Sequence, residues 1–76
     1  MPKIPRVTGD EAVRAFGRAG FVTVRISGSH NIMKKAGHQE RLSIPVHAGK
    51  IVGTGLLKSQ IEAAGLTVEE FISFLK

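Results

Sequence analysis

Residues 21–46 read FVTVRISGSHNIMKKAGHQERLSIPV, and this stretch decides the fold. Its first seven residues are rich in β-branched side chains, which favour a strand. Its last seven alternate apolar and polar side chains, as a strand with one buried face does. Residues 28–29 and 36–39 have the composition of tight turns. The stretch therefore predicts an antiparallel meander with strands over 21–27, 30–35 and 40–46.

One helix is predicted before the meander in the sequence, and two are predicted after it. Thr8 begins a capping box, and the apolar spacing after it predicts a helix over 9–19. After the meander, Thr54 is predicted to cap a second helix, which ends at Gly65. A second capping box at residues 67–70 opens a short final helix.

The predicted order of elements is an α+β arrangement. The sheet must bury one face, and the two longer helices are amphipathic, so both pack most simply on that face. Phe16, Leu57 and Ile61 are then expected to be buried against the sheet, and the opposite face stays open to solvent. This α-β-β-β-α topology, with a short extra C-terminal helix, is that of double-stranded-RNA-binding domains.

Length and charge limit the classes of function. The chain has 76 residues, which allows one domain over 1–76 and no second core. The net charge of +5 indicates an anionic partner, either nucleic acid or an acidic protein. The alternative is a charge that serves only solubility. The chain has no tryptophan or tyrosine, which argues against an aromatic platform for single-stranded bases.

Cysteine content and hydropathy predict the location. The chain has no cysteine, which excludes disulfides and thiolate metal sites and fits a reducing compartment. No apolar run resembles a signal peptide or is long enough to cross a membrane. We therefore expect a cytoplasmic protein with no membrane partner. Scattered histidines without clustered carboxylates do not make a zinc site, so we expect no metal and no small-molecule cofactor.

His30 is the candidate catalytic residue. It directly follows the turn Gly28-Ser29 and precedes the basic pair Lys34-Lys35. An imidazole accepts or donates protons near neutral pH, and cations beside it attract phosphate. Proton transfer beside a phosphate-binding surface suggests cleavage of RNA, with the 2′-hydroxyl as nucleophile. The alternative is an exposed turn histidine without a role.

A basic hairpin is predicted beyond this turn. Lys34, Lys35 and Arg41 lie on its two strands, and Arg25 lies on the preceding strand. We expect these side chains, together with Ser29 of the turn, to contact the RNA backbone. The alternative is a solvated edge that discourages aggregation.

Two strand registers are open, and they differ in where they put His47. The first register pairs Lys35 with Glu40. It sets His30 opposite Pro45 and makes His47 a diagonal neighbour on the same face, roughly 7–8 Å away. Two histidines would then flank one phosphate.

The second register is shifted by one residue and pairs Lys34 with Glu40. It turns the second histidine to the other face of the sheet. It also aligns Ile32 with Leu42 in the core, whereas the first sets Lys34 against Arg41, which is unfavourable unless an anion lies between them. The second register is slightly favoured, and it leaves a single histidine to carry catalysis.

The chain resembles the HicA toxins, which are small ribonucleases of bacterial or archaeal toxin–antitoxin pairs. The likeness extends from about Thr8 to Leu75 and rests on the order and spacing of short motifs. These motifs are Gly28-Ser29-His30, IPVH at 44–47, LLKSQIEAAGL at 56–66 and VEEF at 68–71.

The resemblance implies metal-independent cleavage of mRNA by a domain of double-stranded-RNA-binding-like fold, with a HicB antitoxin as partner. It implies that His30 is catalytic, and Gly28 and His47 are candidates for a supporting role. Asn31 stands where a second histidine or another polar residue often follows the first, and it receives no role. The alternative function is a non-catalytic RNA-binding module that uses the same face.

Overall fold

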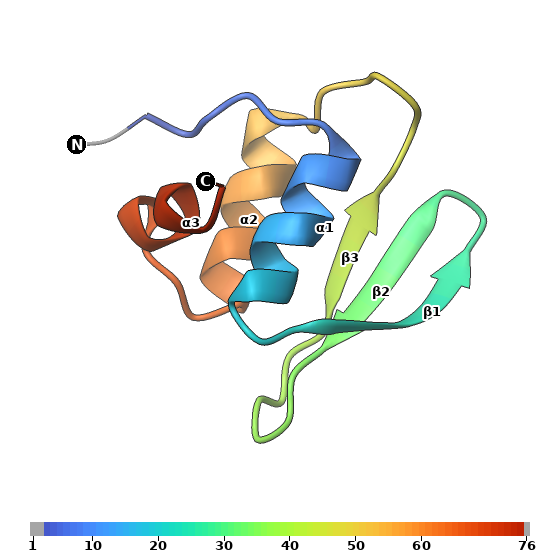
Figure 1. The fold of residues 1–76 in the computed structure, drawn as a ribbon, viewed down its shortest axis with the longest axis vertical. Helices are drawn as coiled ribbons and strands as arrows, with labels where there is room; N and C mark the ends of the chain where they lie inside the picture. The colour runs from blue at the N-terminus through green and yellow to red at the C-terminus, as the bar shows by residue number, and fades with distance from the viewer. Residues whose placement is uncertain (1–2, 76) are drawn as a thin grey trace.

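The computed structural model describes residues 3–75 as a three-stranded antiparallel sheet with three helices (Figure 1). The elements are α1 (Gly9–Arg18), β1 (Val22–Ser27), β2 (His30–Lys34), β3 (Leu42–Pro45), α2 (Thr54–Ala63) and α3 (Val68–Phe74). The strand order is β1-β2-β3, so β2 is central. The predicted α+β class and order of elements are confirmed.

Two of the three predicted helix caps are present. Thr8 Oγ1 accepts a hydrogen bond from the Glu11 N–H at 3.2 Å, and Glu11 Oε1 accepts one from the Thr8 N–H at 2.8 Å. The bond from the Thr8 backbone holds the pKa of the Glu11 carboxyl below its usual value. The same capping box opens α3. The cap predicted at Thr54 is wrong, because Thr54 is already the first helical residue and Gly53, without a side chain, is the N-cap.

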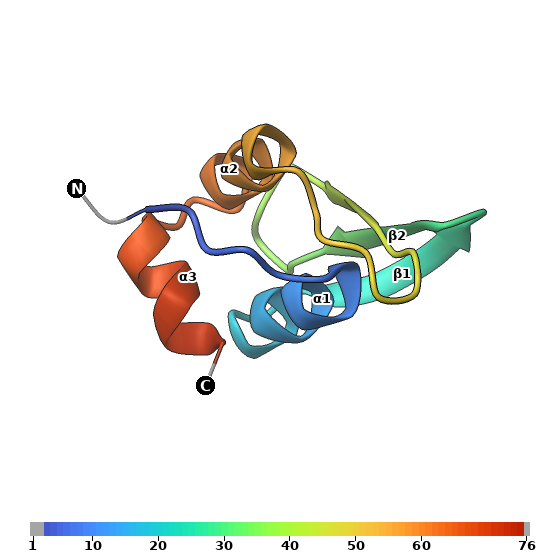
Figure 2. The same cartoon turned by 90° about the horizontal axis from the view of Figure 1, so that it is seen from above.

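One face of the sheet carries the core. Met33, Leu42 and Ile44 on this face are each at most 1% exposed. Both α1 and α2 contact β3, and the β1–β2 hairpin extends away from the helices (Figure 2). The helices therefore cover one face, as predicted, and the other face of β2 and β3 is open.

Aromatic side chains hold the helices together. Phe16 of α1 is fully buried, and its ring centroid lies 4.9 Å from that of Phe71 and 6.2 Å from that of Phe21. Leu57 and Ile61 of α2 are buried in the same core. The burial predicted for Phe16, Leu57 and Ile61 is confirmed.

The pairing of β2 with β3 differs from the register favoured above. His30 lies opposite Pro45, and Met33 lies opposite Leu42. The expected alignment of Ile32 with Leu42 is therefore wrong. The physical reason is that the core takes Met33, which is 1% exposed, and leaves Ile32 half-buried on the open face. Because side chains alternate along a strand, this choice sets the face of every residue in β2.

A β-bulge at Val24 changes the direction of the side chains in β1. The register shifts between Thr23 and Arg25, which pair with consecutive residues of β2, so Val24 is the extra residue. Without it, Arg25 would pair with Asn31 and face the helix side. With it, Arg25 pairs with Ile32 and shares the open face.

The start of α1 approaches the end of β3 so closely that residue 9 must be glycine. A β-carbon on Gly9 would overlap the Pro45 carbonyl oxygen and lie 2.7 Å from the Val46 Cα. We expect Gly9→Ala to push α1 off the sheet and to lower the free energy of unfolding by about 1–3 kcal/mol. Urea denaturation measures this loss.

The matched control is Gly17→Ala, in the same helix. A β-carbon on Gly17 meets nothing within 4 Å, so this change should raise the free energy of unfolding by about 0.5–1 kcal/mol. Equal effects of the two substitutions would contradict the close contact between α1 and β3.

Candidate functional site

His30 is the first residue of β2, and the preceding turn fixes its backbone. Gly28 has a φ of +60°, which favours glycine, and with Ser29 it forms a two-residue loop between the paired residues Ser27 and His30. Glycine at the first loop position is typical of a type II′ hairpin turn. The Ser29 carbonyl accepts a hydrogen bond from the Val46 N–H at 2.7 Å, so the turn is tied to the end of β3. The His30 side chain is exposed, but the backbone from which it projects is restrained by the turn and by this hydrogen bond.

Two rows of side chains cross the open face of the sheet. The row nearest the turn consists of Ser27, His30 and Pro45. The next row consists of Arg25, Ile32 and Ser43. His30 therefore has an arginine and a serine as diagonal neighbours, and the bulge at Val24 brings the arginine there.

A hollow of about 380 Å³ lies on this face. It is lined by Arg25, Ser27, Ile32, Arg41, Leu42 and Ser43. The lining combines the guanidinium groups of Arg25 and Arg41, the hydroxyls of Ser27 and Ser43, and the side chain of Ile32. Guanidinium and hydroxyl groups are the usual partners of phosphate and sugar oxygens in nucleic-acid complexes.

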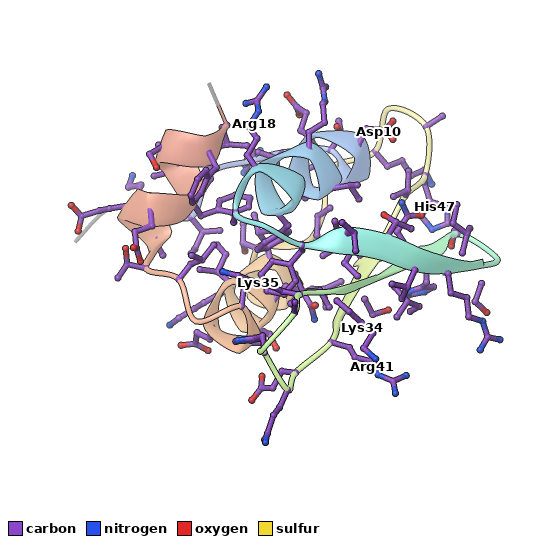
Figure 3. The ribbon with its side chains drawn as sticks, turned by 60° about the horizontal axis from the view of Figure 1, so that its bottom comes forward. Asp10, Arg18, Lys34, Lys35, Arg41 and His47 are labelled. Carbon is purple, nitrogen blue, oxygen red and sulfur yellow. The ribbon has the colours of Figure 1, made fainter. Side chains whose placement is uncertain are left out.

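The basic residues predicted for the hairpin do not all lie together in the structure. Lys34 and Arg41 lie side by side, at the end of β2 away from His30 (Figure 3). Continuing the observed pairing beyond Leu42 sets these two cations opposite each other, an arrangement that a bound anion would stabilise. Lys35 lies elsewhere, with its Nζ 5.7 Å from the centre of the buried Phe21 ring.

His47 lies in the loop after β3. The strand ends at Pro45 instead of residue 46, so strand pairing does not hold this histidine beside His30. Figure 3 shows it well separated from Lys34 and Arg41. The His47 carbonyl accepts a hydrogen bond from the Lys50 N–H at 3.0 Å, which shapes the loop.

His38 has a structural environment. Its Nε2 lies 2.7 Å from the Ala63 carbonyl oxygen, and its ring meets the Phe21 ring edge-on at 5.5 Å. Because a carbonyl oxygen only accepts, Nε2 donates in this bond. His38 thus ties the β2–β3 turn to the last turn of α2.

Sequence reasoning missed Ser43 and Gln60. Ser43 Oγ lies 3.1 Å from His30 Nδ1, and the Ser43 N–H donates to Gln60 Oε1 at 2.9 Å. The alternation of Leu42, Ser43 and Ile44 does indicate that Ser43 faces away from the core. Its contact with His30 follows only from the register, which the alternation leaves open.

Residues 3–75 contain no group of three or more histidine, cysteine or acidic side chains able to hold a metal ion. None of the helices in the same residues is long and apolar enough to cross a membrane.

The fold and this face define a class of protein: a small α+β protein of double-stranded-RNA-binding topology, with an exposed histidine and cations on its open sheet face. A family model described as the HicA toxin of bacterial toxin–antitoxin matches residues 9–66. The match covers more than half of the chain, so the protein belongs to the HicA toxin family and is a toxin of a toxin–antitoxin system. No curated protein matches the chain.

Proposed function

We propose that this toxin is a metal-independent endoribonuclease that cleaves mRNA in the cytoplasm, with His30 as its catalytic residue. The observation that carries the proposal is the exposed imidazole of His30 at the end of a cationic sheet face, diagonal to Arg25 and close to the hollow. General acid–base chemistry and phosphate binding meet there.

The reaction needs two proton transfers. The ribose 2′-oxygen attacks the phosphorus while its proton passes to a base, and the bond from phosphorus to the 5′-oxygen breaks as an acid protonates that oxygen. The products are a 2′,3′-cyclic phosphate and a 5′-hydroxyl. One imidazole can take the first proton and deliver the second, because its protonated form after the first step is the acid that the second step requires.

The cations bind and stabilise the substrate in this proposal. Arg25, Lys34 and Arg41 contact phosphates along the open face, and Ser29 contacts the backbone next to the turn. Arg25 also stabilises the charge that develops on the scissile phosphate. Lys35 adds positive charge from the other side of the hairpin.

The antitoxin is proposed to be a HicB-type protein that covers the histidine face. The toxin carries a net charge of +5, so an acidic inhibitor would associate with it rapidly through electrostatic steering. Covering the open face would exclude RNA without any change in the toxin's core.

The proposed mechanism can be tested directly, because it requires the ribose 2′-hydroxyl as nucleophile. The purified toxin should cut an RNA oligonucleotide and leave DNA of the same sequence intact, because DNA lacks the 2′-hydroxyl. Cleavage should continue in EDTA and yield 5′-hydroxyl ends, which end-labelling on a gel detects. The control is the same RNA with one 2′-deoxynucleotide at the cleavage site, which should resist cutting there. Cutting of DNA, or loss of activity in EDTA, would contradict the mechanism.

A non-catalytic RNA-binding module is the second candidate, because the cationic face supports binding whether or not cleavage follows. Removing His30 distinguishes the two candidates. If the protein is an enzyme, the change should stop cleavage and leave RNA binding intact, whereas a binding module has no cleavage to lose.

A further inference from the structure

A hydroxyl lies beside His30 on the open face of the sheet. His30 Nδ1 lies 3.1 Å from Ser43 Oγ, within hydrogen-bond distance. Ser43 is not directly opposite His30; it is paired with Ile32, which makes it the diagonal neighbour on β3. The contact therefore depends on the observed register and would be lost in the register shifted by one residue.

We propose that Ser43 is the positioning residue of the active site: it engages Nδ1 of His30 and thereby makes Nε2 the atom that exchanges protons with RNA. This inference rests on the proposed catalytic role of His30. The two ring nitrogens are distinct, and the partner of one decides which proton state the other has. With Nδ1–H donating to Ser43 Oγ, Nε2 carries the lone pair that a general base needs.

A hydroxyl suits both halves of the reaction. When Nε2 takes the proton of the 2′-hydroxyl, the ring becomes an imidazolium with a proton on each nitrogen. Nδ1–H still donates to Ser43 Oγ, and Nε2–H now delivers its proton to the departing 5′-oxygen. The bond between Nδ1 and Oγ persists through both proton transfers, so the ring keeps its orientation throughout the cycle.

Ser43 is itself held in place by the fold. Its N–H donates to Gln60 Oε1 at 2.9 Å, which links β3 to α2. Its neighbours in the strand, Leu42 and Ile44, are both fully buried and anchor the backbone on each side. The hydroxyl therefore projects from a rigid strand, whereas the His30 imidazole is exposed to solvent.

The first test compares Ser43→Ala with Ser43→Thr. Alanine removes the hydroxyl, and we expect a fall of about 10- to 100-fold in the single-turnover rate of RNA cleavage at saturating toxin, because the ring loses its orientation. The affinity for RNA should change much less than the rate, because Arg25, Lys34 and Arg41, which are proposed to contact the phosphates, are all retained. Threonine keeps the hydroxyl and should restore most of the rate. Ser73→Ala, an exposed serine on α3, is the matched control.

The second measurement does not depend on activity. Two-bond ¹H–¹⁵N correlation spectra of the imidazole report which nitrogen of His30 is protonated in the neutral ring. Wild type and Ser43→Thr should show the Nδ1–H form, and Ser43→Ala should show increased Nε2–H form. Unchanged spectra and an unchanged rate in Ser43→Ala would overturn the inference, as would failure of threonine to restore the rate.

A double-mutant cycle separates this inference from the proposed function. In a His30→Ala background, Ser43→Ala should cause no further loss of activity, because Ser43 acts through the imidazole. If His30→Ala alone left cleavage intact, the proposed function would fail, and the spectra would still decide whether Ser43 sets the tautomer. If the two losses multiplied, Ser43 would act independently of His30 and the inference would be wrong.

Discussion

Replacing His30 with alanine is expected to reduce RNA cleavage to a small residual rate and to abolish the growth arrest that follows induction of the toxin. General acid or base catalysis by a positioned side chain contributes about 10²–10⁴-fold to a rate, and His30 is proposed to carry both proton transfers. The side chain is exposed on the open face of the sheet, so the fold should be unaffected.

The measurement compares wild type with His30→Ala in two assays. Total RNA from induced cells, treated with EDTA during analysis, reports cleavage, and fluorescence anisotropy with a labelled RNA reports binding. Loss of cleavage with retained binding supports the enzyme. If both versions arrested growth equally, or if neither did, the catalytic assignment would be lost and the RNA-binding module would become the leading function.

Truncating Phe16 to alanine is expected to remove about half of the protein's free energy of unfolding. The ring is fully buried, and its centroid lies 4.9 Å from that of Phe71 in α3 and 6.2 Å from that of Phe21, which directly precedes β1. Such a truncation lowers the free energy of unfolding by about 3–5 kcal/mol. A chain of this length has roughly 4–11 kcal/mol in total at 0.05–0.15 kcal/mol per residue.

Urea denaturation followed by circular dichroism measures this loss. The matched control is Phe74→Ala, since Phe74 is only partly buried at the edge of the same core. Its loss should be clearly smaller than that of Phe16→Ala. Equal losses would mean that the core is not centred on Phe16, and a silent Phe16→Ala would contradict the packing of α1 against α3.

Local chemistry made much of the fold predictable. The capping boxes at Thr8 and Thr67 mark two helix starts because their hydroxyls and glutamates satisfy backbone groups within a few residues. Gly28 marks the hairpin turn because its positive φ is readily adopted only by glycine. His30 stands out as a candidate because it directly follows that turn.

Which side chains lie on the open face of the sheet was less predictable, because this depends on the pairing between strands. One error came from choosing Ile32 over Met33 as the core residue, since both are apolar and they differ only in which face they occupy. The bulge at Val24 has no local signal, yet it decides that Arg25 shares a face with His30. Lys34 and Lys35 were predicted together, although consecutive side chains in extended backbone point in opposite directions.

The sequence by itself determined the order of helices and strands, the positions of the turns, the positive charge and the histidine that follows the first hairpin. These follow from interactions between residues close together in the chain. The tertiary structure decided the register of β2 on β3, the face that Arg25 occupies and the contact between Ser43 and His30. A strand can slip by one residue without violating any local preference, and only the burial of Met33, Leu42 and Ile44 against the helices selects one register.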